Sequence, residues 1–170
     1  FSGAMSTIIS FGIPWVIVKY IPQYIDTDLT SAKQLIRKIL NYSIVMSFVF
    51  LVIIYFLAPV LDVYIYKEIN NFSLILLVTS INVPISILMG IIISLYRSAF
   101  KIKEIMLYGT FIIVPLRAML TYFIFIYTDN IMYFIGIEIF STFISLSLLF
   151  YLFNKNEFPI IFVKKDIDFK

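Results

Sequence analysis

The chain has 170 residues, of which 62% are hydrophobic and 14% charged, and its mean hydropathy is +1.03. A soluble domain is about 45–50% apolar and about 25% charged, so this composition excludes a water-soluble globular fold, which could not hide so much apolar surface in its core. The absence of cysteine and histidine excludes disulfides, Cys/His metal sites and histidine acid–base chemistry, whereas the net charge of +3 is less informative than where the charges lie.

Long apolar segments follow one another along the chain, at residues 3–20, 40–61, 72–96, 105–127 and 131–153. Each is about 18–25 residues long, the length that spans roughly 30 Å of hydrocarbon as a helix. The sequence therefore predicts an all-α integral membrane protein with five transmembrane helices. The chain starts inside the first segment, without the basic region and cleavage site of a signal peptide, so we expect it to be a fragment of a longer protein.

The connection after the first segment has a helical pattern of its own. Its apolar residues recur at helical spacing, at Leu29, Ala32, Leu35, Ile36 and Ile39. This pattern predicts an amphipathic helix over 29–39 that lies in the inner interface of the membrane, with Asp28 as its N-cap. Asp26-Thr27-Asp28 also resembles the D-x-D motif of metal-using glycosyltransferases, but a solvated cap is the favoured interpretation of this acidic pair.

Lysine and arginine alternate between the connections. The first, third and fifth connections hold most of them, namely Lys19, Lys33, Arg37 and Lys38; Arg97, Lys101 and Lys103; and Lys155, Lys164, Lys165 and Lys170. The second connection holds only Lys67, and the fourth holds none. Because cytoplasmic loops are enriched in these residues, we expect the three basic connections, including the tail 154–170, to be cytoplasmic and the amino end to face outward.

Two charged residues lie inside predicted spans. Arg117 lies about 18 Å along the fourth segment from Ile105, and Glu138 lies roughly 10 Å along the fifth from Ile131. The fourth segment is measured from the inner edge and the fifth from the outer edge of a hydrocarbon core about 30 Å thick. The two positions therefore have similar depth in neighbouring antiparallel helices. Charged groups within a bilayer face a cavity or pair with one another. The sequence therefore predicts either a polar cavity lined by Arg117 and Glu138 or an ion pair that fixes the packing of two helices.

Proline occurs within three of the five segments, as Pro14, Pro84 and Pro115. Proline frees a backbone carbonyl and kinks a helix, and broken helices mark substrate sites in many transporters. Asn82 stands two residues before Pro84 and is a further candidate for the cavity. The alternative is that these prolines reflect only the frequency of proline in membrane helices.

Three stretches of the chain carry a family resemblance. The first runs from Gly12-Ile13-Pro14 through Lys19-Tyr20-Ile21-Pro22-Gln23-Tyr24 to Ala32-Lys33-Gln34-Leu35-Ile36, the second is Leu95–Lys101, and the third is Pro115-Leu116-Arg117. Together they resemble the polysaccharide and O-antigen repeat-unit flippases (the Wzx type) of the multidrug/oligosaccharidyl-lipid/polysaccharide exporter superfamily. The resemblance covers essentially the whole chain and implies helices two to six of such a protein, within the N-terminal lobe of a two-lobe, MATE-like transporter of the cell inner membrane.

The resemblance implies a function as well as a fold. Its substrate would be an undecaprenyl-phosphate-linked oligosaccharide, moved outward for surface polysaccharide biosynthesis, with the polysaccharide polymerase machinery as a further partner and no nucleic acid. No cofactor or metal is implied beyond a coupling ion, H⁺ or Na⁺. Arg117 would attract the anion, Glu138 would pair with Arg117 or couple to the ion, and Lys19 and Arg97 would line the cytoplasmic mouth.

Two other functions stay open at this point. One is a cation-coupled multidrug exporter of the same superfamily. The other is a non-catalytic membrane subunit of glycan synthesis, because the lack of His, Cys and a convincing acidic site disfavours an enzyme.

Overall fold

The computed structural model of the chain describes residues 2–64, 71–128 and 130–156, without the side chains of residues 2, 25–27, 29 and 156. These residues form helices and no strand. The helices are α1 (Ser2–Ile9), α2 (Ile13–Thr27), α3 (Leu29–Tyr64), α4 (Phe72–Ser80), α5 (Asn82–Ser98), α6 (Ile102–Glu104), the π-helical segment η1 (Ile105–Phe111), α7 (Ile113–Tyr127) and α8 (Ile131–Asn156). The all-helical prediction is therefore confirmed for the described residues.

Four helical stretches of the described residues are long and apolar enough to cross a membrane, namely Thr30–Tyr64, Phe72–Ser98, Ile102–Tyr127 and Ile131–Lys155. A fifth is added if α1 and α2, bent by 53° at their junction, count as one span. The coarse prediction of a multi-helix membrane protein agrees with this arrangement. The second connection with Lys67 and the tail from residue 157 onward lie outside the described residues.

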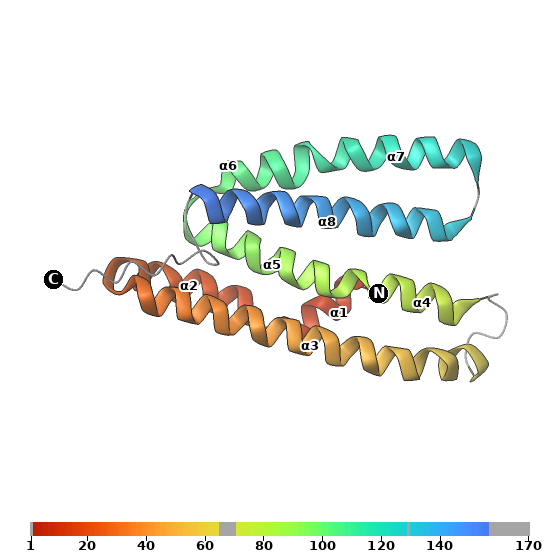
Figure 1. Ribbon diagram of the computed structural model, residues 1–170, viewed down its shortest axis with the longest axis horizontal. Coiled ribbons are helices and arrows are strands. Elements are labelled where there is room, and N and C mark those ends of the chain that lie inside the picture. Colours follow the sequence, from red (N-terminus) through yellow and green to blue (C-terminus); the bar gives the residue numbers. More distant parts are fainter. Residues whose placement is uncertain (1, 65–70, 129, 157–170) are drawn as a thin grey trace.

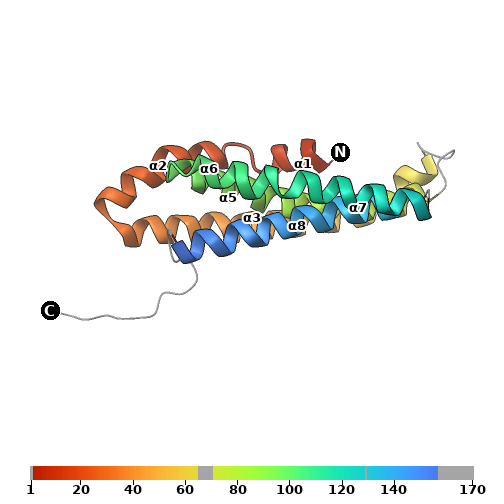
Figure 2. The ribbon, with the colours of Figure 1, turned by 90° about the horizontal axis from the view of Figure 1, so that it is seen from above.

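Helix α5 lies at the centre of the bundle. It contacts α1 and α2 on one side and α3 and α8 on the other (Figures 1 and 2). Helix α7 packs against α8 at the edge of the bundle farthest from α3 (Figure 1). The α2–α3 turn, the end of α5, the start of α6 and the end of α8 all lie at one end of the molecule (Figure 1), so the first and third connections, both rich in Lys and Arg, meet there.

The first predicted helix, residues 3–20, is two helices in the structure. Residues 10–12 separate α1 from α2, and Gly12 adopts a left-handed backbone conformation with φ of 79°. Glycine reaches this region without steric cost. Pro14 stands at the second position of α2, where its missing N–H leaves no helical hydrogen bond unmade. The Gly12–Pro14 pair therefore restarts the helix in a new direction.

The predicted amphipathic helix is present, but it continues without a break into the next span as the 36-residue helix α3. Asp28 caps it as predicted. Its carboxylate accepts hydrogen bonds from the Thr30 backbone N–H at 3.0 Å and from the Thr30 and Ser31 hydroxyls, each at 2.6 Å. The bond from the Ser31 hydroxyl and those from Thr30 lower the pKa of Asp28 from 3.8 to about 2.

Two further breaks stand next to prolines. The third span is interrupted at Ile81, between α4 and α5, because Pro84 has no N–H to offer the carbonyl four residues before it. The fourth span begins with α6 and continues as η1, after which the N–H of Ile112 bonds the Leu107 carbonyl, five residues back, at 3.1 Å. Pro115 follows in the first turn of α7. The structure thus places a helix break beside each of the three predicted kink residues.

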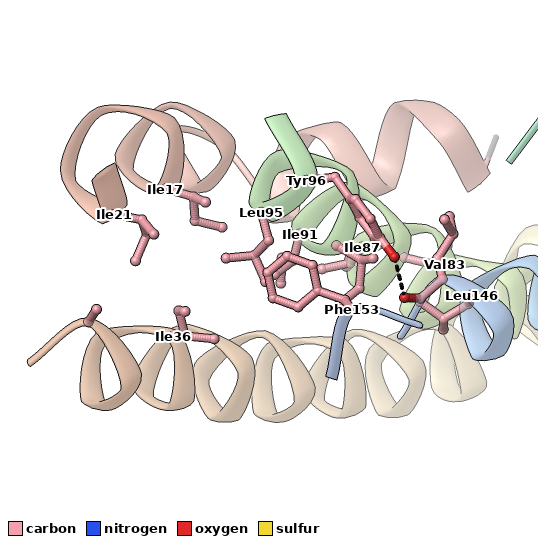
Figure 3. Packing of buried hydrophobic residues seen from close by; sticks show 13 residues of the cluster. Ile17, Ile21, Ile36, Val83, Ile87, Ile91, Leu95, Tyr96, Leu146 and Phe153 are labelled. Carbon is pink, nitrogen blue, oxygen red and sulfur yellow. Dashed lines mark hydrogen bonds between the residues drawn. The ribbon is translucent and has the colours of Figure 1, made fainter. Parts of the chain in front are cut away.

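The main core lies around α5, toward the end with the α2–α3 turn. It joins the buried side chains Ile17, Ile21, Ala32, Ile36, Val83, Ile87, Ile91, Ile92, Leu95, Tyr96, Leu146, Leu149 and Phe153 (Figure 3). Tyr96 of α5 donates its hydroxyl to the Leu149 carbonyl of α8 at 3.0 Å and packs edge-on against Phe153, with ring centroids 5.1 Å apart. A smaller cluster at the other end joins Ile54, Ala58 and Leu76.

Candidate functional site

Arg117 is held on α8 by two hydroxyl groups. Its Nε donates to Ser141 Oγ at 2.8 Å, and its Nη2 donates to Thr142 Oγ1 at 3.0 Å. Both hydroxyls in turn donate to the backbone carbonyl of Glu138, at 3.1 and 2.7 Å. Because their protons point back along α8, the oxygen lone pairs are free to accept from the guanidinium. The local geometry of α8 therefore makes a two-point support for an arginine from α7.

Glu138 is connected to α5 through Asn82. The amide nitrogen Nδ2 of Asn82 donates to Glu138 Oε1 at 3.1 Å. Asn82 opens α5 directly after the break at Ile81, so the break associated with Pro84 positions this amide against α8. Asn82 is only 4% exposed, and its Oδ1 has no hydrogen-bond partner among the described residues. A polar path therefore runs from α5 through α8 to α7.

The predicted ion pair between Arg117 and Glu138 is not formed. Arg117 bonds hydroxyls and Glu138 bonds an amide, and no carboxylate of the described residues lies within 4.0 Å of the guanidinium. The two residues still belong to one network, because the hydroxyls that hold Arg117 are bonded to the Glu138 backbone. The positive charge is therefore supported by dipoles and is not neutralised by a counter-charge in this part of the chain.

The side chain of Arg117 lines an open hollow of about 520 Å³ on the outer surface of α7. The hollow is formed by Val114, Arg117, Ala118, Thr121, Tyr122 and Phe125. Glu138 and Asn82 are not part of its lining; Glu138 is exposed and Asn82 is buried. The predicted cavity candidates are thus connected by hydrogen bonds, but of the three only Arg117 borders this hollow, whose lining is almost entirely apolar, and its guanidinium is turned toward α8.

The two predicted residues of the cytoplasmic mouth lie on neighbouring helices. Lys19 is exposed on α2, with its ammonium 5.2 Å from the centre of the Tyr20 ring. Arg97 is exposed in the last turn of α5. Helices α2 and α5 pack against each other, so the two cations stand on helices that are in contact. Neither lines the hollow of Arg117.

Sequence reasoning did not identify Ser141 or Thr142 as part of the site. Ser141 lies three residues after Glu138, and Thr142 lies four residues after it, so all three share one face of a helix. The segment around them is otherwise largely apolar. A polar i, i+3, i+4 group within a span is the signal that identifies them. Such a group offers hydroxyl acceptors to a neighbouring helix.

The arrangement favours ion recognition over covalent chemistry. It presents a guanidinium with N–H groups still unpaired by the described residues, inside an apolar helix pair where electrostatic attraction is stronger than in water. Comparison with protein families, characterised proteins and solved structures finds no match for this chain. The functional argument therefore rests on the residues themselves.

Proposed function

We propose that this chain is part of a membrane transporter that moves an anionic, lipid-linked oligosaccharide across the inner membrane. In this proposal the chain supplies helices two to six, and the first lobe, of a two-lobe flippase that works by alternating access. The basic end of the bundle faces the cytoplasm. The hollow at Arg117 then lies toward the outer half of the membrane, and the oligosaccharide headgroup reaches it during translocation.

One observation carries the proposal. Arg117 is a charged residue within an apolar span, and its partners are two neutral hydroxyls in place of a carboxylate. A permanent charge in this environment is costly unless a partner or water meets it. Arginine also forms bidentate hydrogen bonds with phosphate oxygens. A diphosphate-bearing substrate therefore supplies the counter-charge that the described residues lack.

The same observation favours an anionic substrate over a cationic drug. A multidrug exporter that binds organic cations needs an available carboxylate. In this chain Glu138 accepts the amide of Asn82 and stands outside the hollow that Arg117 lines. A cation in the hollow would lie beside the guanidinium of Arg117, and like charges near one another in an apolar site are destabilising.

The proposal is tested with the complete protein in liposomes that contain fluorescent undecaprenyl-diphosphate-linked oligosaccharide. The rate of appearance of the sugar on the far side is measured for the wild type, Arg117→Ala and Arg117→Lys. A hydrogen bond to a charged group contributes about 1.5–3 kcal/mol, so Arg117→Ala should slow transport by about 10- to 100-fold. Arg117→Lys keeps the positive charge but loses the paired N–H groups of the guanidinium, so it should give an intermediate rate.

Thr121→Ala is the matched control, because Thr121 lines the same hollow one turn away and carries no charge. It should transport the oligosaccharide within about twofold of the wild-type rate. Transport at the wild-type rate by properly inserted Arg117→Ala protein would refute the proposal. Export of cationic dyes by a wild-type protein that does not move the oligosaccharide would favour the drug exporter.

A further inference from the structure

A second hollow lies on the opposite side of α8 from α7, where α3 and α8 flank α5. Its volume is about 390 Å³. Helix α5 forms the floor with Leu88 and Ile92, and the walls come from α3 and α8. Most of the lining is aliphatic or aromatic. Figure 2 shows α3 and α8 on the same side of α5, and the groove that these three helices line is partly open.

The polar groups of the groove gather at one end. Arg37 lies in the third turn of α3, and Asn41 follows one turn later on the same face. Lys33 precedes Arg37 by four residues and extends this polar face toward the α2–α3 turn. Beyond Asn41 the α3 wall becomes apolar at Ile44. The groove therefore has a cationic mouth and an apolar interior, ordered along the helix axis.

The order of charge and apolar surface in the groove favours a lipid as its occupant. From Arg37 to Ile44 the groove extends about 10 Å along α3, at roughly 1.5 Å per residue. Arg37 is the one charged residue of its lining and stands at one end, whereas most of the remaining lining is apolar. A lipid with one anionic headgroup and an acyl chain matches this order. An apolar helix in the same place would leave Arg37 without a counter-charge.

We propose that this groove is a binding site for an anionic phospholipid, with one acyl chain between α3 and α8 and the phosphate at Arg37 and Asn41. Basic pockets between membrane helices bind lipid headgroups through such charge complementarity, and the guanidinium matches phosphate geometry. The lipid belongs to the leaflet at the basic end of the bundle. This site requires the helices to lie in a bilayer but does not depend on the transport activity proposed above.

The test uses the complete protein, purified in neutral detergent and titrated with dioleoyl-phosphatidylglycerol or dioleoyl-phosphatidylcholine. These lipids share their tails and differ in headgroup charge. Native mass spectrometry measures the dissociation constant of the first bound lipid. The wild type should prefer the anionic lipid, and Arg37→Gln should weaken its binding about fivefold, the effect of one basic residue near a membrane surface. Lys38→Gln removes the same charge from the next residue, which does not line the groove, and should change binding less than twofold.

A second pair of variants tests the tail. Ser147 lies in the α8 wall and is exposed, so Ser147→Trp fills the groove and should weaken both lipids at least fivefold. Val52→Trp places the same ring on an exposed α3 position outside the groove and should leave both dissociation constants within twofold. Equal effects of Arg37→Gln and Lys38→Gln, or unchanged binding in Ser147→Trp, would overturn the proposal. So would a wild-type dimer that Ser147→Trp converts to monomer without lipid loss.

Discussion

Helices α5 and α7 are both apolar spans, yet they are held in the bundle in different ways. Helix α5 is surrounded by four other helices and buries Ile87, Ile91, Leu95 and Tyr96 almost completely. Of the α7 side chains only Ile113 is buried. Helix α7 packs on α8, and among the described residues its polar attachment is the bonding of Arg117 to Ser141 and Thr142.

The difference shows what each helix contributes. In lipid, apolar side chains gain nothing from leaving water, so helices associate through close packing and hydrogen bonds. Helix α5 uses close packing and is the structural centre. Helix α7 uses a charged tether and leaves most of its surface uncovered, including the hollow at Arg117. We therefore assign stability to the surroundings of α5, and the proposed contact with the substrate belongs to α7.

Truncating the α5 core should give the largest effect on stability. Leu95 is 0% exposed, and Leu95→Ala should lower the free energy of unfolding by about 2–5 kcal/mol through the cavity that it leaves. Ile126→Ala on α7 removes a similar volume from a side chain that is 58% exposed and should cost less than about 0.5 kcal/mol. Reversible unfolding in mixed detergent measures both. Equal losses would remove the distinction between the two helices.

The tether of α7 should give a smaller but specific effect. A double-mutant cycle of Arg117→Leu with Ser141→Ala should show a coupling energy of about 0.6–1.7 kcal/mol, the range found for hydrogen bonds between membrane helices. The same unfolding assay measures the coupling. Pairing Arg117→Leu with Ser145→Ala is the control, because Ser145 lies one turn farther along α8 and its Oγ has no partner among the described residues. Coupling equal to that control would mean that the tether contributes nothing.

The smallest effect should come from the cap of α3, at the packed end of the bundle. The folded-state pKa of Asp28 is about 2, below its ordinary value of 3.8, so its carboxylate stabilises the fold fully above about pH 4 and loses that contribution as the pH falls toward 2. Asp28→Asn keeps an acceptor oxygen but does not titrate. As the pH falls from 4 to 2, the unfolding midpoint of the wild type should therefore fall relative to that of Asp28→Asn. A constant difference over that range would contradict the assignment.

Much of the fold could be predicted from the sequence, because long apolar runs specify helices directly. The predicted boundaries 131–153 and 72–96 lie within a few residues of the observed helical stretches. Continuity was harder to predict. The predicted helix 3–20 is interrupted at Gly12. The predicted interfacial helix and the following span form one helix, because no helix-breaking residue stands at their junction, Ile39–Leu40.

The site was predictable in its members but not in its connections. Arg117, Glu138 and Asn82 stood out because polar groups are rare within spans. Their pairing depends on rotation of α7 and α8 about their axes, which the apolar pattern does not specify when most faces are apolar. In the observed rotation Arg117 donates to Ser141 and Thr142. Glu138 accepts a hydrogen bond from Asn82 instead of pairing with Arg117.

The central proposal is that the charge of Arg117 attracts anions to the hollow that it borders. The chain has no cysteine, so Thr121→Cys places one reactive thiol in the hollow beside Arg117. In the complete protein in liposomes, an anionic methanethiosulfonate reagent should modify this thiol at least tenfold faster than a cationic one. Arg117→Gln should abolish the preference, and Val52→Cys on α3 should not react. Failure of both reagents to reach Thr121→Cys, or equal rates with Arg117 in place, would contradict the account.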